Sequence, residues 1–120
     1  MKRQDLENRL ITFSIRVIKF VESFERGKAN SILANQLIKS CTSASLNYGE
    51  AQSAESLKDF IHKVQIGLKE LRETFVGLRI MIGVRSIESQ ESKEILDENN
   101  QLIAIFVKSV QTAKSRVRHH

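Results

Sequence analysis

The sequence has no proline, no tryptophan and only one cysteine among its 120 residues. A lone Cys41 excludes an internal disulfide bond and a zinc cluster built from several cysteines of one chain. Proline is absent and there are only five glycines, so few of the residues that break helices or form tight turns are available. This composition favours a helical protein with few tight turns.

Long apolar runs are also missing. The longest, residues 102–107, is far too short to span a bilayer, and charged residues near the N-terminus interrupt any signal-peptide core. We therefore expect a cytoplasmic protein without membrane contact. The length and a composition of 41% hydrophobic and 28% charged residues predict a single globular domain, residues 1–120. His119 and His120 are either native or a tag remnant and carry no inference here.

Apolar residues recur at alternating spacings of three and four in four segments of the chain. These segments run from Leu6 to Phe24, from Leu33 to Ala51, from Leu57 to Ile82 and from Leu96 to Val117. A stripe of this period keeps one face of a helix turned toward partner helices. The pattern predicts an all-α fold, an antiparallel, left-handed, up-down-up-down four-helix bundle. Ser56 and Asp59 form the pattern of a capping box, and "GVRSIESQES", residues 83–92, is expected to be a loop.

The second segment replaces the leucines of its inward stripe with small and polar residues. Small residues allow a neighbouring helix to approach closely, and a buried asparagine fixes the register of packed helices. Asn47 would need a partner, either Glu70 or Glu73 on the third segment or a backbone carbonyl. We therefore expect a buried polar layer of Ser40, Asn47, Glu70 and Glu73. A ligand-binding or catalytic site is the alternative interpretation of this stretch.

A family resemblance rests on residues 36–74, "QLIKSCTSASLNYGEAQSAESLKDFIHKVQIGLKELRET", and on "DLENRLITF" at residues 5–13. These stretches resemble the bacterial four-helix-bundle family of 23S rRNA intervening-sequence proteins, also described as S23 ribosomal-protein-like. The resemblance implies an antiparallel bundle, a ring-like homopentamer and no established enzymatic activity. The proline that many relatives carry after the first helix is missing, which leaves only the shape of that loop open.

The positions that carry the resemblance are Gln36-Leu37, Ser40, Ser43, Asn47-Tyr48, Glu50-Ala51, Ser56, Lys58-Asp59-Phe60, Lys63, Lys69-Glu70 and Glu73-Thr74. A more distant resemblance links the chain to the accessory protein of diversity-generating retroelements. That protein is a basic pentamer that binds nucleic acid and a reverse transcriptase. The analogy favours a nucleic-acid role for this chain.

The first segment carries a second apolar row, formed by Ile11, Ile15 and Ile18. The row lies roughly 140° around the helix from the core stripe. Because a four-helix core cannot readily reach both faces of one helix, the row predicts an oligomer interface. A wide core face with scattered exposed isoleucines is the alternative.

Positive charge is unevenly distributed along a chain whose net charge is +5. The residues expected to contact RNA or DNA are Lys2, Arg9, Arg16, Lys114, Arg116 and Arg118. The first three are spaced by seven and share one edge of a helix, whereas the last three belong to an acid-free segment after Glu98. Contacts to phosphates are expected rather than base reading, because Tyr48 is the only tyrosine. The alternative is a protein-interaction or scaffold module whose basic charge is incidental.

Patterns that support catalysis are scarce. Asp59 and His62 approximate one half of a di-iron carboxylate motif, but no second histidine precedes the C-terminus. Cys41 and the serines lack a suitable histidine and acid, and there is no glycine-rich phosphate loop. We expect a protein without enzymatic activity, catalytic residues, metal or cofactor.

Overall fold

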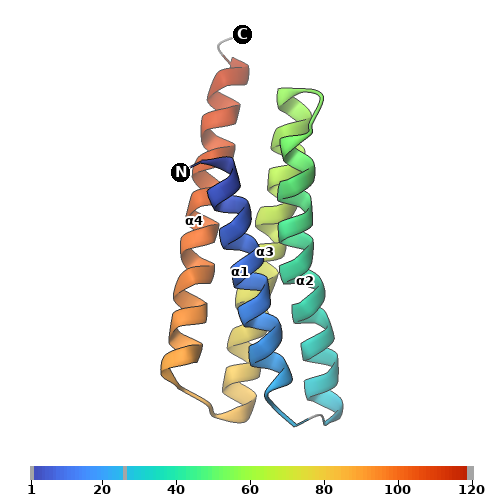
Figure 1. Cartoon of the computed structure of the whole chain (residues 1–120), viewed down its shortest axis with the longest axis vertical. Helices are drawn as coiled ribbons and strands as arrows, with labels where there is room; N and C mark the ends of the chain where they lie inside the picture. Colours follow the sequence, from blue (N-terminus) through green and yellow to red (C-terminus); the bar gives the residue numbers. More distant parts are fainter. Residues whose placement is uncertain (1, 26, 119–120) are drawn as a thin grey trace.

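The computed structural model describes residues 2–25 and 27–118, which form four helices (Figure 1). The helices are α1 Arg3–Glu22, α2 Lys28–Gln52, α3 Leu57–Arg85 and α4 Gln90–Arg118. Each helix runs antiparallel to the one before it, and together they make a rod with extents of 52 × 24 × 21 Å. The predicted all-α antiparallel four-helix bundle is confirmed. In the described part of the chain, no helix is both long and apolar enough to cross a membrane.

The core face of α1 is the one that the sequence predicts. Leu6, Leu10, Phe13 and Val17 are all buried against the other helices. Phe24, the last residue of that predicted stripe, is half-buried beyond the end of the helix, where its ring packs edge-on against Phe20. Burial of these side chains is the main source of favourable free energy for attaching α1 to the bundle.

The core face of α3 agrees with the predicted stripe at Val64, Leu71 and Leu78 and differs by one residue at the alternate positions. The buried residues are Val64, Gly67, Leu71, Thr74, Leu78 and Met81. Leu68, Phe75 and Ile82, which the spacing also placed inward, are half-buried. The reason is steric, because the smaller residues Gly67 and Thr74 allow closer approach to α4 and α2 than Leu68 and Phe75 would.

Two glycines of α3 mark where neighbouring side chains press on its backbone. A Cβ atom added to Gly67 would lie 2.8 Å from Cε2 of Phe106 on α4. A Cβ atom added to Gly77 would lie 2.8 Å from Cδ2 of Leu37 on α2. Real Cβ contacts are longer than this, so both glycines create space for a large apolar neighbour.

The predicted buried polar layer is only partly correct. Ser40 is buried, and its hydroxyl lies 2.7 Å from Oγ1 of the fully buried Thr74 on α3. Asn47 is half-buried rather than buried, so its place in the layer is wrong. Its partner is a backbone carbonyl, one of the expected kinds, but it belongs to Ser43 of the same helix, to which Nδ2 donates at 2.9 Å. The Thr74 hydroxyl also lies 2.8 Å from the Glu70 carbonyl, to which it can donate while it accepts from Ser40, so this pair joins α2 to α3 without an amide.

The fully buried amide lies on another helix. Asn99 of α4 is 0% exposed, and its Nδ2 donates to the Leu71 carbonyl of α3 at 3.0 Å. Among the described residues its Oδ1 has no hydrogen-bond partner. An unpaired buried acceptor is costly, and the bond to α3 is favourable only in one register. Asn99 is thus the buried asparagine that fixes the register of packed helices, the role that the sequence suggested for Asn47.

The connections follow ordinary capping chemistry. Ser56 precedes α3, and its Oγ accepts the backbone N–H of Asp59 at 3.0 Å, as the capping-box pattern predicts. The loop predicted to begin at Gly83 is shorter than expected, because α3 continues to Arg85 and ends at Ser86 with a left-handed φ of 55°. The Arg85 guanidinium lies 4.8 Å from the Phe24 ring centroid, which anchors this last turn.

Candidate nucleic-acid interface

Two of the predicted nucleic-acid contacts lie in the seam between α1 and α4. Arg9 makes a bidentate pair with Glu98, with Nε to Oε2 at 2.8 Å and Nη2 to Oε1 at 2.7 Å. Its Nη2 also donates to Oε1 of Gln101 at 2.8 Å. Arg16 reaches Glu91 at 3.0 Å and Glu94 at 3.2 Å.

These ion pairs reduce the number of free cations along the predicted edge of α1. The hydrogen bonds to Glu98 raise the pKa of Arg9, and the hydrogen bond to Glu91 raises the pKa of Arg16, so both remain charged. Their charge is compensated by α4 carboxylates, so the predicted edge of Lys2, Arg9 and Arg16 does not present three free cations. Of the three predicted residues, Lys2 is exposed and forms no ion pair within residues 2–25 and 27–118. Nucleic-acid contact by Arg9 or Arg16 stays a prediction, and it would require displacing an existing partner.

The same pairs fix the relative height of the two helices. Because Arg9 lies beside Glu98 and the helices are antiparallel, Arg3 lies level with about residue 104 of α4. The residues from Ile105 to Arg118 therefore extend about 21 Å beyond the start of α1, at about 1.5 Å per residue. Figure 1 shows this projecting end of α4 past the first turn of α1.

Cations gather at this end of the bundle. We call the set the basic end, and its members are Lys2, Arg3, Lys108, Lys114, Arg116 and Arg118. All six are exposed, and no ion pair involves them in the described part of the chain. The acidic residues of α4 lie in its first half, where Glu91, Glu94 and Glu98 face the arginines of α1. The structure thus places Lys2 at the same end of the bundle as the three predicted C-terminal cations, which lie on the part of α4 that projects beyond α1.

A cleft of about 870 Å³ opens at the basic end, and we call it the end cleft. It lies where α1 would continue if it were as long as α4. The residues that line it are Arg3, Leu6, Tyr48, Ala51, Gln52, Ala54, Glu55, Ser56, Leu57, Phe60, Ile105, Lys108, Ser109, Thr112, Ala113 and Arg116. Three exposed cations face one exposed acid, Glu55, above a mostly apolar floor.

The floor of the end cleft contains an aromatic ring and an unpaired amide oxygen. Tyr48 is 5% exposed and packs on Phe106, with ring centroids 5.6 Å apart. Burial raises the pKa of Tyr48, so its phenol is neutral at physiological pH. Gln52 donates from Nε2 to the Tyr48 carbonyl at 3.3 Å, whereas its Oε1 is buried and has no partner among the described groups.

Arg3 and Lys108 are the members of the basic end that the sequence reasoning missed. A signal for the cleft wall was present, because Glu91, Glu98, Ile105 and Thr112 follow one another at spacings of seven. The first two face α1, so the next two must face the space beyond it. The sequence alone did not show where α1 begins relative to α4.

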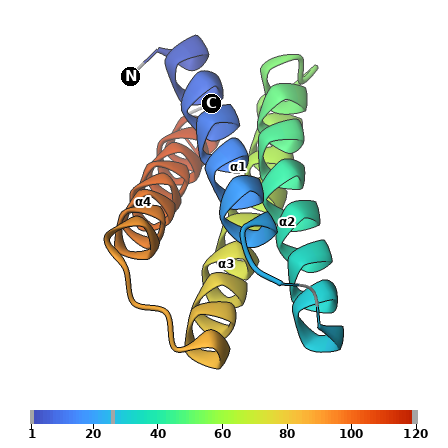
Figure 2. The same ribbon diagram turned by 60° about the horizontal axis from the view of Figure 1, so that its bottom comes forward.

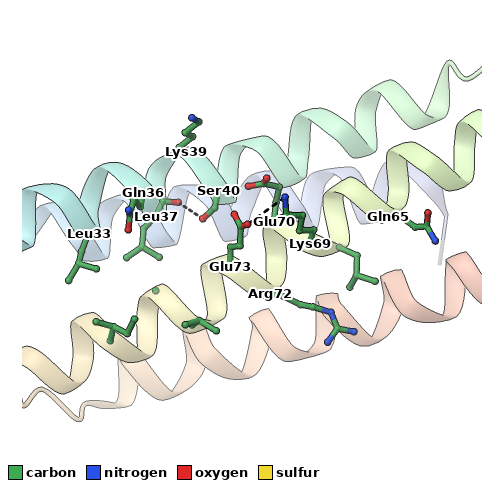
Figure 3. A pocket seen from close by; sticks show the side chains of 14 residues that line it. Leu33, Gln36, Leu37, Lys39, Ser40, Gln65, Lys69, Glu70, Arg72 and Glu73 are labelled. Atoms are coloured by element: carbon green, nitrogen blue, oxygen red, sulfur yellow. Dashed lines mark hydrogen bonds and ion pairs between the residues drawn. The ribbon is translucent and has the colours of Figure 1, made fainter.

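A second hollow, the α2–α3 groove, has a volume of about 970 Å³ (Figure 3). Glu70 and Glu73, which were predicted to lie in the buried layer, instead line this groove with Lys39 and Lys69. Glu73 is exposed and Glu70 is half-buried. Partial burial raises the pKa of Glu70, and the neighbouring Glu73 carboxylate raises it further. The prediction of these two carboxylates as core partners is therefore wrong.

The predicted isoleucine row divides into two parts. Ile11 and Ile15 are 44% and 47% exposed, whereas Ile18 is partly buried against the core. Val76, Ile80 and Val84 make a second exposed row at spacings of four on α3. Oligomer contact through Ile11, Ile15 and Ile18 stays a prediction, with Ile11 and Ile15 available for it.

The groups considered for catalysis have ordinary structural surroundings. Cys41 is 0% exposed, and its burial raises the pKa of the thiol to about 11, so almost no thiolate forms at neutral pH. Its partners lie in the α1–α2 contact, where Ser14 donates to the Cys41 carbonyl at 3.1 Å. His62 is exposed. Within the described ranges, no group of three or more histidine, cysteine, aspartate or glutamate residues could hold a metal ion.

The fold and this surface define a class of protein, a small antiparallel four-helix bundle with a basic end and a cleft beside it. Residues 3–108 match the family model of the 23S rRNA-intervening sequence proteins. The chain belongs to this family. The family model covers all of the first three helices from Arg3 onward and the first two thirds of α4.

A solved structure supports the same fold. The chain is similar to a protein of unknown function from the S23 ribosomal protein family of Bacteroides thetaiotaomicron, with 24% sequence identity and a TM-score of 0.79. The similarity covers 88% of this chain and 97% of that chain. No curated protein matches this chain. The comparisons thus establish family and fold, and the resemblance to the 23S rRNA intervening-sequence proteins is confirmed.

Proposed function

We propose that this chain is a non-catalytic accessory protein that binds nucleic acid, preferably RNA, through phosphate contacts at its basic end. One observation carries the proposal. The exposed cations of α4 beyond the start of α1 have no ion-pair partners in the described part of the chain, whereas Arg9 and Arg16 do. Unpaired surface cations attract phosphates and release counterions when they bind them.

The family supports RNA over DNA, because its name refers to intervening sequences of 23S rRNA. A homo-oligomer, which we propose to be a pentamer, would repeat the basic end in each subunit. Weak phosphate contacts could then add through avidity. The chain alone has a net charge of +5, so the subunits of a ring would together present a strong positive field.

The test is an anisotropy titration of a generic single-stranded RNA at several salt concentrations. The wild-type chain should bind with an affinity whose logarithm falls linearly with the logarithm of salt. The triple variant Lys114→Glu, Arg116→Glu and Arg118→Glu should bind more weakly with all RNA sequences. Its salt slope should be smaller by about 0.7 for each phosphate that the variant no longer neutralises.

A matched control places the same charge change at the opposite end of the bundle. Lys19→Glu, Lys28→Glu and Lys93→Glu also change the net charge from +5 to −1, since each substitution removes two units. Those residues are exposed near the α1–α2 and α3–α4 connections. Equal losses in both triple variants would exclude a specific basic end. No binding by the wild type at about 0.15 M salt, with protein at tens of micromolar, would refute the proposal.

The homo-oligomer has its own test. Ile11 and Ile15 on α1 and the row Val76, Ile80 and Val84 on α3 are exposed apolar surfaces on different helices. Two unlike patches suit a head-to-tail ring, in which one patch of each subunit covers the other patch of its neighbour. Ile15→Glu should lower the mass measured by light scattering while the helical circular dichroism persists, because the interface would bury a charge. A monomeric wild type would contradict the assembly.

A protein-interaction module is the second candidate. The α2–α3 groove favours it, because apolar residues such as Leu33, Val76 and Ile80 line the groove beside charged ones. Capture of a protein partner that persists after nuclease treatment would support this function. Loss of that partner on Gln36→Trp, at an exposed lining position outside both apolar rows, without loss of RNA binding, would separate the two candidates.

A further inference from the structure

We propose that the end cleft takes up one unpaired nucleotide of a bound RNA, with the base on the cleft floor and the adjoining phosphate at the rim. This inference rests on the proposed function and adds a base-binding site to the phosphate contacts. Four observations support it: the position of the cleft, the charge of its rim, the chemistry of its floor and an unpaired amide oxygen.

The position of the cleft makes it open without movement of the bundle. It lies beyond the first turn of α1, between the projecting end of α4 and the α2–α3 connection. Its volume of about 870 Å³ lies within the range of small-ligand pockets, about 300–1,000 Å³. A flexible single strand can insert a nucleotide here, whereas a paired base is held inside its duplex.

The rim has the charge that a phosphate needs. Arg3 enters from the start of α1, and Lys108 and Arg116 enter from α4. Ser109 and Thr112 lie between the two α4 cations in sequence and add hydroxyl donors to the same wall. The single acid, Glu55, leaves the rim with an excess of positive charge, so an anionic group is favoured over a neutral apolar peptide.

The floor has the surface that a base needs. Phe60 and Ile105 are half-buried and provide aromatic and aliphatic surface, which a nucleobase covers by stacking or van der Waals contact, while the mostly buried Tyr48 lies at the bottom of the cleft. Tyr48 is held firmly because its other neighbour is the buried ring of Phe106. A free phosphate or sulfate would leave this floor uncovered, so the cleft suits a ligand with both an anionic and a flat apolar part.

The amide of Gln52 gives the base a polar partner. Its Nε2 is already used by the Tyr48 carbonyl, but its buried Oε1 accepts no hydrogen bond from any described residue. Buried acceptors in folded proteins are normally paired, and because Gln52 lines the cleft, a small rotation of its side chain would let this oxygen accept a hydrogen bond from a donor on a bound base. Every RNA base carries an N–H group on its Watson–Crick edge or amino group that could supply it. The cleft should therefore accept different bases with little sequence preference.

The experiment compares two RNA hairpins that differ in one overhanging residue, which is a normal nucleotide in one and an abasic nucleotide in the other. Both have the same number of phosphates. The wild-type protein should bind the hairpin with the normal nucleotide about tenfold more tightly, a factor within the range for stacking one base on an aromatic side chain. This ratio should change little with salt, whereas both affinities fall, because stacking neutralises no phosphate.

Tyr48 supplies a direct signal from the cleft floor. It is the only tyrosine, and the chain has no tryptophan, so the intrinsic emission of the protein comes from this ring. Saturation with the normal overhang should change that emission more than saturation with the abasic overhang. Equal changes would place the base outside the cleft.

Ser109→Trp tests the site by filling the cleft without removing a charge. This variant should bind both hairpins equally, with the affinity that the wild type has for the abasic hairpin. The matched control is Gln111→Trp, an exposed position two residues along α4 that does not line the cleft, and it should keep the tenfold ratio. Circular dichroism checks that both variants retain the helical fold.

The outcomes separate this inference from the proposed function. Equal binding of the two hairpins by the wild type would overturn base uptake and leave phosphate binding at the basic end intact. A tenfold ratio that survives Ser109→Trp would overturn the end cleft as its location. Failure of the wild type to bind either hairpin would refute the proposed function, and base uptake with it.

Discussion

The two sides of α4 show different ways of holding helices together. Toward α3, α4 packs closely, with Phe106 against Gly67 and the buried Asn99 bonded to the Leu71 carbonyl. Toward α1 the packing is sparser, and Figure 2 shows the start of α4 standing apart from α1. That seam is bridged by the long side chains of Arg9 and Arg16.

The difference shows which seam can carry an open functional surface. Close packing between α3 and α4 needs small residues such as Gly67 and leaves no space between these two helices at Phe106, whereas the outer side of α3 lines the α2–α3 groove. Ion pairs between long side chains bridge α1 and α4 where these helices pack sparsely, and such partly exposed pairs contribute little to the free energy of unfolding. The open cleft and the basic end both lie along the line of this looser seam, beyond the last ion pair.

The largest predicted effect is on the tight side of α4. Phe106→Ala should lower the free energy of unfolding by about 3–5 kcal/mol, because it removes a fully buried ring and leaves a cavity over Gly67. Urea denaturation at one fixed protein concentration measures the change, since assembly would couple stability to concentration. Phe75→Ala, at a half-buried position, should cost clearly less. A decrease below about 1 kcal/mol for Phe106→Ala would mean that the ring does not fill the interior.

A smaller effect is expected on the loose side. Arg9→Met with Arg16→Met should lower the free energy of unfolding by about 1 kcal/mol at low salt, because partly exposed ion pairs contribute little. The decrease should shrink at about 0.5 M salt, where the wild-type pairs are screened. Arg72→Met is the control, because Arg72 is exposed and forms no ion pair among the described residues. A cost that is independent of salt would show that packing rather than charge holds this seam.

The smallest effect concerns two glycines of α3, Gly67 and Gly83, whose replacement by alanine should change the free energy of unfolding in opposite directions. Gly83→Ala should raise the free energy of unfolding by up to about 1 kcal/mol, because the helix gains propensity and the added Cβ meets no atom within 4 Å. Gly67→Ala should be destabilising, because the Phe106 ring must shift. In a protein that also carries Phe106→Ala, Gly67→Ala should instead raise the free energy of unfolding, because the ring is no longer there. Stabilisation by Gly67→Ala in the wild type would show that the ring moves without cost.

Much of the fold could be predicted from the sequence because the helices depend on the spacing of apolar residues that are near one another in the chain. The alternation of three and four residues, the lack of proline and the Ser56–Asp59 cap define helices before any long-range contact is known. The prediction failed where two nearby positions could both face inward. On α3 the buried face lies one residue earlier at alternate positions, with Gly67 in place of Leu68 and Thr74 in place of Phe75, because these smaller residues permit closer approach.

The candidate site was harder to predict because charge along a helix does not show what lies opposite. Arg9 and Arg116 look alike in sequence, yet Arg9 meets Glu98 whereas Arg116 lines an open cleft. The distinction depends on where one helix begins beside another. Neither the composition nor the heptad spacing contains that information.

The sequence by itself determined four helices, their inward stripes to within one position, the family of the chain and the acid-free end of α4. Only the tertiary structure decided that Asn99 rather than Asn47 is the buried amide, and that α4 extends past α1 to leave the end cleft. The physical reason is that helix formation depends on neighbours in the chain. Burial, ion pairing and open space depend on the relative heights and rotations of packed helices.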